Sequence, residues 1–297
     1  MIDAIISGSY SDVLAIKTAR ILGVELIKPE VKKFPDGETY VRITGPVEGK
    51  KVAVIQSMAQ YPNENLIEYF LTVNTLKDLG AKEVIGVIPY FAYARQDERF
   101  KEGEAISLKI IAYLIEKAGT DAVITVDMHR HRVSDMSKIF SISVTDLSAV
   151  SELTRYMMKY YNMENPAVIG PDAESEAWAK IAAKILNTDY YILSKQRFSG
   201  TEVKVSVKDK LNVEGRDVFI VDDIISTGGT IVNAMEILKE HGAKDVYVAC
   251  THPILVMHAL AKIYEKGAKV VIGTDTVNSP ISFVSVAPII AEELKKY

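Results

Sequence analysis

The segment Val218–Thr230 reads VFIVDDIISTGGT and joins an apolar run to a helical pattern through a short turn. Two adjacent carboxylates, Asp222 and Asp223, follow the apolar run directly. The turn, from Ser226 to Thr230, consists of small, hydroxyl-bearing and glycine residues. This succession is typical of a buried strand that leads into a helix, and in doubly wound α/β folds ligands bind at this end of the strands. The segment therefore predicts an α/β fold with a binding site after this strand.

A local phrase that occurs four times supports this fold class. It reads LGAKEV and HGAKDV around Gly80 and Gly242, and looser copies surround Gly119 and Gly267. In each copy a helical pattern stops at the glycine, which adopts the left-handed conformation that ends a helix at little cost. The β-rich runs that follow are short and apolar on both faces. We therefore expect parallel strands that helices cover on both sides.

The same phrase indicates two domains, because its copies form two clusters, one in each half of the chain. We expect α/β domains at residues 1–145 and 146–297, each a mostly parallel sheet flanked by helices. The last helix is expected to pack back on the N-terminal domain. Apolar spacing predicts helices over residues 65–79 and 230–241, and a third helix for which Ser107 is the N-cap.

Composition excludes several functional classes. The formal net charge of the 297 residues is −4 and the basic residues are scattered, so no nucleic-acid-binding stripe is indicated. No apolar run reaches the roughly 18 residues of a membrane span, and no secretory signal is visible, so we expect a cytoplasmic protein without a membrane partner. Cys250 lies in an apolar run and is interpreted as a buried strand thiol. Walker, CxxC and HExxH motifs are absent, and no GxGxxG follows a strand.

The residues after the opening strand are suited to a sugar phosphate. Backbone N–H groups of a glycine-rich turn and of a helix N-terminus bind phosphate. The carboxylates of Asp222 and Asp223 would repel the phosphate itself, but they can accept hydrogen bonds from neighbouring sugar hydroxyls. The alternative is a strand, a turn and a helix cap without a ligand.

VFIVDDIISTGGT resembles the phosphoribosyl-diphosphate-binding loop that phosphoribosyltransferases and ribose-phosphate pyrophosphokinases share. The resemblance implies phosphoribosyltransferase-type domains. It also implies that Asp222 and Asp223 contact the ribose 2- and 3-hydroxyls and that the turn binds the 5-phosphate. The residues of this turn are Ser226, Thr227, Gly228, Gly229 and Thr230. Ser226 stands where many bacterial-type members have an acidic residue, and the loop alone does not separate the two families.

A second segment, KFPDGE, resembles the pyrophosphokinase loop that contributes to ATP binding, often across a subunit boundary. The resemblance implies ATP contacts for Phe34, Asp36, Gly37 and Glu38. Without the resemblance, the segment is a Pro/Gly turn that carries an aromatic ring and two acids.

A third segment, PYFAYARQD, follows an apolar run and puts Arg95 and Gln96 at the end of another strand. An arginine there can pair with phosphate oxygens in a fork, and a glutamine can hydrogen-bond an adenine edge or a ribose. PYxxYARQD is specific to the pyrophosphokinases, so the resemblance implies ATP binding by both residues. Arg99 is a weaker candidate, because Glu98 stands where many members have a basic residue.

Two further strands end in VDMH and GPD. The resemblance assigns His129 to the metal–ATP site and Asp172 to the metal, which makes Mg²⁺ the expected cofactor. A lone histidine is more often an ordinary polar residue, and Mg²⁺ prefers oxygen ligands. Glu174 and Ser175 stand where the family usually has two glycines, so the shape of the loop after Asp172 is an open question.

The segment LSKQR places Lys195 and Arg197 two residues apart, so both side chains point the same way on an extended segment. The alternative is an exposed basic strand. The resemblance implies that both residues are catalytic and stabilise the charge that develops during transfer, and that Arg197 also contacts ribose 5-phosphate. We expect this pair and the turn after residue 225 to converge on one cleft.

These segments extend from residue 33 to residue 230, and the chain is identified as a member of the ribose-phosphate pyrophosphokinase family. The implied reaction converts ATP and ribose 5-phosphate to AMP and 5-phosphoribosyl 1-diphosphate, and the implied assembly is a homo-oligomer. A phosphoribosyltransferase would lack the ARQD segment. A catalytically silent partner subunit would not need Lys195, Arg197, His129 and Asp172. A nucleotide-regulated transcription factor would be expected to have a basic surface.

Overall fold

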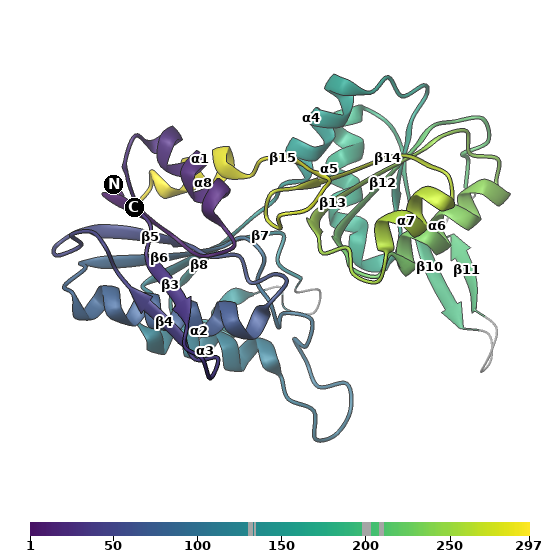
Figure 1. Ribbon diagram of the computed structural model, residues 1–297. Helices are drawn as coiled ribbons and strands as arrows, with labels where there is room; N and C mark the ends of the chain where they lie inside the picture. Colours follow the sequence, from purple (N-terminus) through teal and green to yellow (C-terminus); the bar gives the residue numbers. More distant parts are fainter. Residues whose placement is uncertain (130–132, 134, 198–202, 208–210) are drawn as a thin grey trace. The chain divides into compact units, whose positions relative to one another are not determined.

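The structure, a computed structural model, describes residues 1–129, 133, 135–197, 203–207 and 211–297, and for 194–197 and 203–207 it describes the backbone alone. The described chain forms two compact units (Figure 1). The first comprises residues 1–147, 276–278 and 285–297, and the second comprises 148–275 and 279–284. A boundary between folding domains at residues 145 and 146 stays a prediction.

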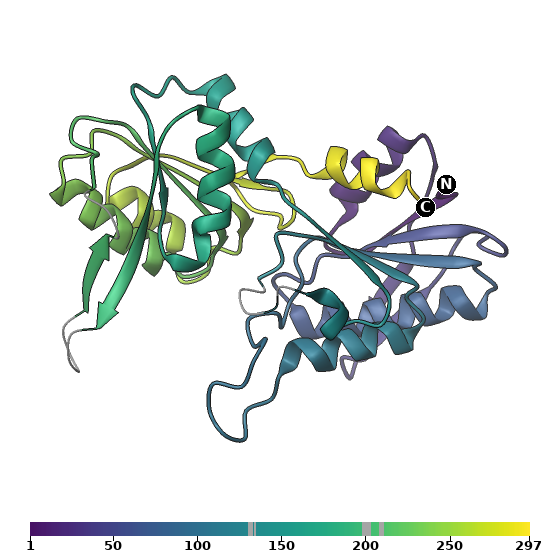
Figure 2. The same cartoon turned by 180° about the vertical axis from the view of Figure 1, so that it is seen from behind.

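The first unit contains a parallel sheet of six strands in the order β2-β1-β5-β6-β7-β8. Helices α1 and α8 cover one face of this sheet and α2 and α3 cover the other (Figures 1 and 2). A separate antiparallel hairpin consists of β3 and β4. The elements are β1 Ala4–Ser7, α1 Asp12–Leu22, β2 Glu25–Ile27, β3 Glu30–Lys33, β4 Thr39–Arg42, β5 Lys51–Ile55, α2 Pro62–Asp78, β6 Glu83–Ile88, α3 Ser107–Ala118, β7 Ala122–Val126, the 3-10 helix η1 Met136–Lys138, β8 Ser143–Leu147 and α8 Ala287–Leu294.

The second unit contains a sheet of seven strands in the order β11-β10-β9-β12-β13-β14-β15, in which only β11 is antiparallel to its neighbour. Helices α4 and α5 contribute to the core on one face, and α6 and α7 to the core on the other. The elements are α4 Val150–Tyr160, β9 Ala167–Gly170, the 3-10 helix η2 Ala173–Ser175, α5 Glu176–Leu186, β10 Tyr190–Arg197, β11 Val203–Val207, β12 Val218–Ile225, α6 Gly229–Glu240, β13 Val246–Pro253, α7 Ala259–Glu265, β14 Ala268–Thr274 and β15 Ser282–Val284.

Burial of the central strands agrees with the expected parallel sheets. Every residue of β12 and of β13 is buried, as is every residue of β7. Cys250 is one of these buried strand residues. The predicted α/β fold of two mostly parallel sheets is therefore confirmed. Helix α8 packs against α1 within the first unit (Figure 2).

The helix ends show which local sequence signals were sufficient to predict where a helix starts or stops. All four glycines predicted to end helices have positive φ, of 83° at Gly80, 110° at Gly119, 77° at Gly242 and 99° at Gly267. The prediction that Ser107 is an N-cap is wrong, because Ser107 is the first residue of α3 and its hydroxyl donates to the carbonyl oxygen of Tyr93 at 2.8 Å. The hydroxyl thus ties the helix start to the preceding loop.

Gly86 tests the packing of α2 on the first sheet. A Cβ atom at residue 86 would overlap the hydroxyl of Tyr69, which is fully buried and lies 2.8 Å from the Thr120 hydroxyl. We expect Gly86→Ala to lower the free energy of unfolding by about 1–3 kcal/mol through overpacking. In the Tyr69→Phe background the same change should cost clearly less, since the overlapping oxygen is gone. Urea denaturation of the four proteins of this cycle measures the coupling, and strictly additive costs would contradict the packing described here.

Candidate active site

The carboxyl end of β12 holds two buried carboxylates at the centre of the second sheet. Asp222 is 6% exposed and Asp223 is 4% exposed. β12 pairs with β9 on one side and with β13 on the other, and Asp222 is in register with Cys250. The backbone N–H of Asp223 donates to the Asp222 carboxylate at 3.0 Å. Strand pairing therefore forces two acids into a part of the sheet that water barely reaches.

A third acid, Asp172, stands just after the neighbouring strand β9 and is partly buried. Burial and the charges of Asp223 and Asp172 raise the pKa of Asp222 well above its ordinary value. Burial and the charges of Glu174 and Asp223 likewise raise the pKa of Asp172. The three carboxylates thus repel one another in a poorly hydrated place, and a ligand that donates hydrogen bonds or carries positive charge relieves this repulsion.

The turn after β12 leads directly into α6. Gly228 has φ of 79°, and a Cβ atom there would lie 3.3 Å from the Cβ and 3.4 Å from the carbonyl oxygen of Ala259. No side chain caps the first turn of α6, and Thr227 and Gly229 are exposed. The N–H groups at the start of this helix are therefore available to an anion.

Sequence reasoning missed the loop that holds this turn from the other side. The backbone N–H of Leu255 donates to the carbonyl oxygen of Ile225 at 2.9 Å, at the end of β12. Leu255, Met257 and His258 all have positive φ, between 53° and 59°. These residue types rarely adopt that conformation. Because no glycine marks this loop, the sequence offered no local signal for it.

Asp172 also organises the loop that follows β9. Its carboxylate accepts from the backbone N–H groups of Glu174 at 3.0 Å and Ser175 at 3.2 Å, which makes it the N-cap of η2. The Ser175 hydroxyl donates back to the Asp172 carbonyl oxygen at 2.6 Å. A Cβ atom at Gly170 would lie 2.5 Å from this hydroxyl oxygen, so Gly170 leaves the space it needs. Glu174 and Ser175, unusual for the family motif, therefore form a closed turn that orients Asp172.

Lys195 and Arg197 belong to β10, and the backbone register fixes their level in the sheet. The parallel pairing of β10 with β9 ends at Ile192 and Gly170, and from Leu193 onwards β10 pairs only with β11. Both residues therefore lie beyond the carboxyl end of β9, at the edge of the sheet that carries the three acids. Their side chains, and the predicted convergence of these side chains on the turn after residue 225, lie outside the part of the chain that the structure describes.

In the first unit, the segment KFPDGE forms the turn of the β3–β4 hairpin. The backbone N–H of Phe34 donates to the carbonyl oxygen of Glu38, and that of Gly37 donates back to the carbonyl oxygen of Phe34, both at 2.9 Å. The Glu38 N–H donates to the Asp36 carboxylate at 3.2 Å. All four predicted residues are exposed, and the Phe34 ring lies edge-on to Tyr40. The hairpin thus presents an aromatic ring and two acids on a well-defined tip.

Arg95 and Gln96 lie in the long loop between β6 and α3 (Figure 1). Arg95 is exposed. The Gln96 side chain donates to the Glu104 carboxylate at 3.0 Å, and this carboxylate also accepts from the backbone N–H groups of Phe100 at 3.0 Å and Lys101 at 2.9 Å. Glu104, which sequence reasoning did not single out, therefore holds the loop together and orients Gln96.

His129 lies three residues beyond β7 and is partly buried. The chain reaches it through Asp127, which has φ of 41° and donates its N–H to the Leu147 carbonyl oxygen at 2.7 Å. The next N–H, that of Met128, donates to the Asp146 carboxylate at 3.0 Å. The end of β8 thus fixes the backbone that presents His129, and His131 lies outside the described residues.

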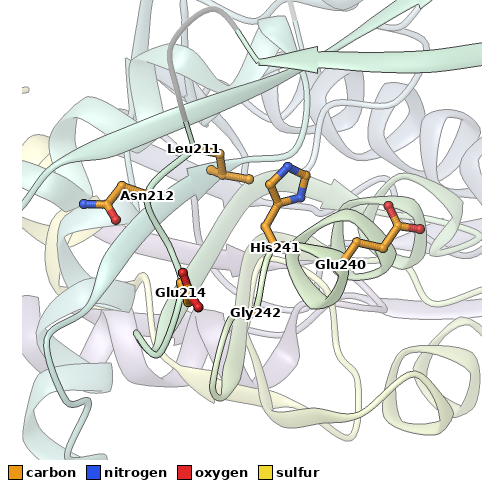
Figure 3. A pocket seen from close by; sticks show the side chains of 6 residues that line it. All are labelled: Leu211, Asn212, Glu214, Glu240, His241 and Gly242. Atoms are coloured by element: carbon orange, nitrogen blue, oxygen red, sulfur yellow. The ribbon is translucent and has the colours of Figure 1, made fainter.

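The second unit also has a cavity of about 720 Å³ (Figure 3). It is lined by Leu211, Asn212, Glu214, Glu240, His241 and Gly242. These residues precede β12 or lie at and just after the end of α6, so they lie at the amino ends of the strands, whereas ligands of such folds bind at the carboxyl ends. The acids and the turn after β12, rather than this cavity, therefore form the candidate site.

Within the described parts of the chain, no three His, Cys, Asp or Glu side chains are grouped so that they could hold a metal ion by themselves. Among the helices that the structure describes, none has both the length and the apolar character that crossing a bilayer requires.

Comparison with known proteins identifies the family. A family model described as the N-terminal domain of ribose phosphate pyrophosphokinase matches residues 4–119, and one described as a phosphoribosyl transferase domain matches residues 137–287. The ribose-phosphate pyrophosphokinase of Methanothermobacter thermautotrophicus is 44% identical over 98% of this chain and 99% of its own length. The chain belongs to the ribose-phosphate pyrophosphokinase family. The predicted family and enzyme class, a transferase of nucleotide biosynthesis, are confirmed.

Other pyrophosphokinases agree with this result. The enzyme of Saccharolobus solfataricus is 36% identical over 92% of this chain and 93% of its own length. The crystal structure of phosphoribosylpyrophosphate synthetase from Mycobacterium smegmatis matches with a TM-score of 0.88 and 30% identity, and the match covers 99% of this chain and 98% of that one. The pyrophosphokinase fold therefore extends over the whole described chain.

The raised pKa of Asp222 has a measurable consequence. Because this pKa lies above the ordinary value of 3.8, the folded state keeps a proton that the unfolded chain loses, and the associated stabilisation disappears as the pH rises through the raised pKa. Asp222→Asn should therefore have a higher melting temperature than the wild type at pH 7–8, and the difference should shrink as the pH falls toward about 4. Asp78→Asn, at an exposed position at the end of α2, is the control. A difference that does not depend on pH would contradict this account.

Proposed function

We propose that this chain transfers the β,γ-diphosphoryl group of ATP to the anomeric hydroxyl of ribose 5-phosphate and releases AMP and 5-phospho-α-D-ribose 1-diphosphate. One observation supports this most directly: β12 carries two buried carboxylates near its carboxyl end, and a short turn leads from this strand to the uncapped start of α6. Carboxylates that accept hydrogen bonds from hydroxyl groups, close along the chain to backbone N–H groups that bind an anion, match a sugar that carries a phosphate. Membership of the pyrophosphokinase family selects the reaction.

The second unit is proposed to bind ribose 5-phosphate. Asp222 and Asp223 accept hydrogen bonds from the 2- and 3-hydroxyls, and these donors offset part of the repulsion between the acids. The 5-phosphate binds to the N–H groups at the start of α6 and to the nearby hydroxyls. The residues of this phosphate site are Ser226, Thr227, Gly228, Gly229 and Thr230. Ser226 is partly exposed and its hydroxyl can donate to a phosphate oxygen, as an acidic residue could not.

The first unit is proposed to bind ATP. Arg95 is exposed and can pair with phosphate oxygens, whereas Gln96 is held in its loop by Glu104 and is suited to a fixed contact with the adenosine. The tip of the β3–β4 hairpin contributes an aromatic ring and acids that are exposed. Its residues are Phe34, Asp36, Gly37 and Glu38. Such an exposed tip can reach a second subunit, which agrees with a homo-oligomer.

Lys195 and Arg197 are proposed to stabilise the transferring group. Diphosphoryl transfer needs little covalent help and much positioning and charge stabilisation. The backbone of both residues lies beyond the carboxyl end of β9, on the side of the sheet where the proposed sugar site lies. They neutralise the charge that develops on the phosphate oxygens, and Arg197 also contacts the sugar phosphate.

His129 and Asp172 are proposed as the residues that hold Mg²⁺ with the nucleotide. The Asp172 carboxylate fits this ion, because Mg²⁺ prefers oxygen, keeps several waters and usually has one or two carboxylate ligands in addition to substrate phosphates, whereas His129 offers nitrogen and would act through a bound water. The repulsion among Asp172, Asp222 and Asp223 also favours a divalent cation. When bound, the ion would neutralise phosphate charge. We also propose a cytoplasmic location, as expected from the sequence.

The reaction is tested by ³¹P NMR of the protein with ATP, Mg²⁺ and ribose 5-phosphate. We expect AMP and a new diphosphate ester. ADP with a monophosphate ester would show a simple kinase, and either that result or no turnover would overturn the proposal.

Lys195→Ala separates catalysis from binding. We expect kcat to fall about 10²- to 10³-fold, because the lost cation acts on charge that develops only during transfer. The affinities for both substrates should change little. Steady-state kinetics and calorimetric titration measure the two effects, and Lys180→Ala, an exposed change on α5 in the same unit, is the control. A loss of ATP affinity with unchanged kcat would contradict the proposed role.

A further inference from the structure

Arg216 is a buried cation at the amino ends of the strands of the second sheet, whereas the acids lie at the carboxyl ends. It lies two residues before β12 and is 7% exposed. Its two terminal nitrogens form a fork with the Asp189 carboxylate, at 2.9 Å from Nη1 and 2.5 Å from Nη2. The remaining N–H donors bind the backbone carbonyl oxygens of Asn165 at 3.1 Å, Pro166 at 2.7 Å and Asn212 at 2.8 Å. All five donors of the guanidinium group are thus used.

These acceptors come from three separate stretches of chain. Asn165 and Pro166 lead into β9. Asp189 immediately precedes β10, and its carboxylate also accepts from the hydroxyl of Tyr191, the second residue of that strand. Asn212 lies on the segment that returns from β11 toward β12. One side chain therefore joins the amino ends of three adjacent strands.

Two of these stretches are the feet of the β10–β11 hairpin. Asp189 immediately precedes the outgoing arm, and Asn212 lies five residues after the end of β11. Between them, only residues 190–192 pair with β9, and the pairing of residues 193–197 with 203–207 is internal to the hairpin. The direction of the hairpin is therefore set by a short piece of parallel ladder, by the packing of residues 190–193 in the core and by the Arg216 contacts.

We propose that Arg216 is a positioning residue for the diphosphoryl transfer, because it fixes both feet of the hairpin that carries Lys195 and Arg197. The proposal rests on the function proposed above. Lys195 lies six residues along the extended chain from Asp189, or about 20 Å. Over such an arm, a rotation of about 3° at the feet moves the tip by about 1 Å, a misplacement that can cost about 10²-fold in rate.

Charge alone does not explain these contacts, which depend on the planar fork of arginine. The fork lowers the pKa of the Asp189 carboxyl, mainly through its hydrogen bonds. A lysine at residue 216 would keep the charge but has only three donors and no plane, so several of the carbonyl oxygens would lose their partner. Arg216→Lys is therefore a sharper test than removal of the charge.

We expect Arg216→Lys to lower kcat about tenfold or more, with KM for ATP and for ribose 5-phosphate within about twofold. The increase in the rate of hydrogen–deuterium exchange should be larger in the β10–β11 ladder than in the β12–β13 ladder. Met157→Ala, a buried change on α4 of the same unit, is the control for a general loss of stability. It should lower the melting temperature without either effect.

The proposal is overturned if Arg216→Lys and Met157→Ala lower kcat by the same factor when they lower the melting temperature equally. It is also overturned if Arg216→Lys raises the hydrogen–deuterium exchange rate equally in both ladders. If Arg216→Lys does not fold, Asp189→Asn, whose side chain is 44% exposed, is measured in the same way. Absence of turnover by the wild type would refute the proposed function. The exchange measurement would still decide whether Arg216 holds the hairpin.

Discussion

Strand pairing that forces like charges together governs the chemistry of the second unit. β12 pairs with β9 and β13, and this leaves Asp222, Asp223 and Asp172 close together in a part of the sheet with little water. The sheet contributes enough buried apolar area to tolerate this repulsion, since every residue of β12 is buried. A site that is electrostatically unfavourable when empty gains from each hydrogen-bond donor or cation that a substrate brings. Relief of the repulsion among the three acids thus contributes to the free energy of ligand binding.

Charged groups are paired at the amino ends of the strands of this sheet and are left to repel one another at the carboxyl ends. At the amino edge, Arg216 and Asp189 satisfy each other through a fork and the carbonyl oxygens take the remaining donors. This buried cation is fully partnered and serves rigidity. At the carboxyl ends of the strands, β12 carries two of the acids and leads into the uncapped start of α6. Sequence-distant residues thus make one edge firm and leave the other ready for ligand.

Sequence reasoning succeeded where the signal is local. Glycines end helices because of their own conformational freedom, and apolar runs that end in Asp or His reveal the carboxyl ends of parallel strands. These rules were enough to predict the α/β fold and to predict which candidate residues lie near the carboxyl ends of the strands. They failed at Ser107, because the choice between a cap and a tie to Tyr93 depends on where the preceding loop runs. Glu104 and Leu255 escaped notice for the same reason, since their roles arise from contacts with other parts of the chain.

The first unit is completed by residues from far along the chain. α8 covers α1, the Ser57 hydroxyl donates to the Thr276 carbonyl oxygen at 2.5 Å, and Lys51 Nζ donates to the Tyr297 carbonyl oxygen at 2.7 Å. On the ribosome, chains emerge N-terminal end first. The α1 face must therefore wait, uncovered, while the whole second unit is synthesised. The unit whose translation begins first is therefore the one whose translation is completed last.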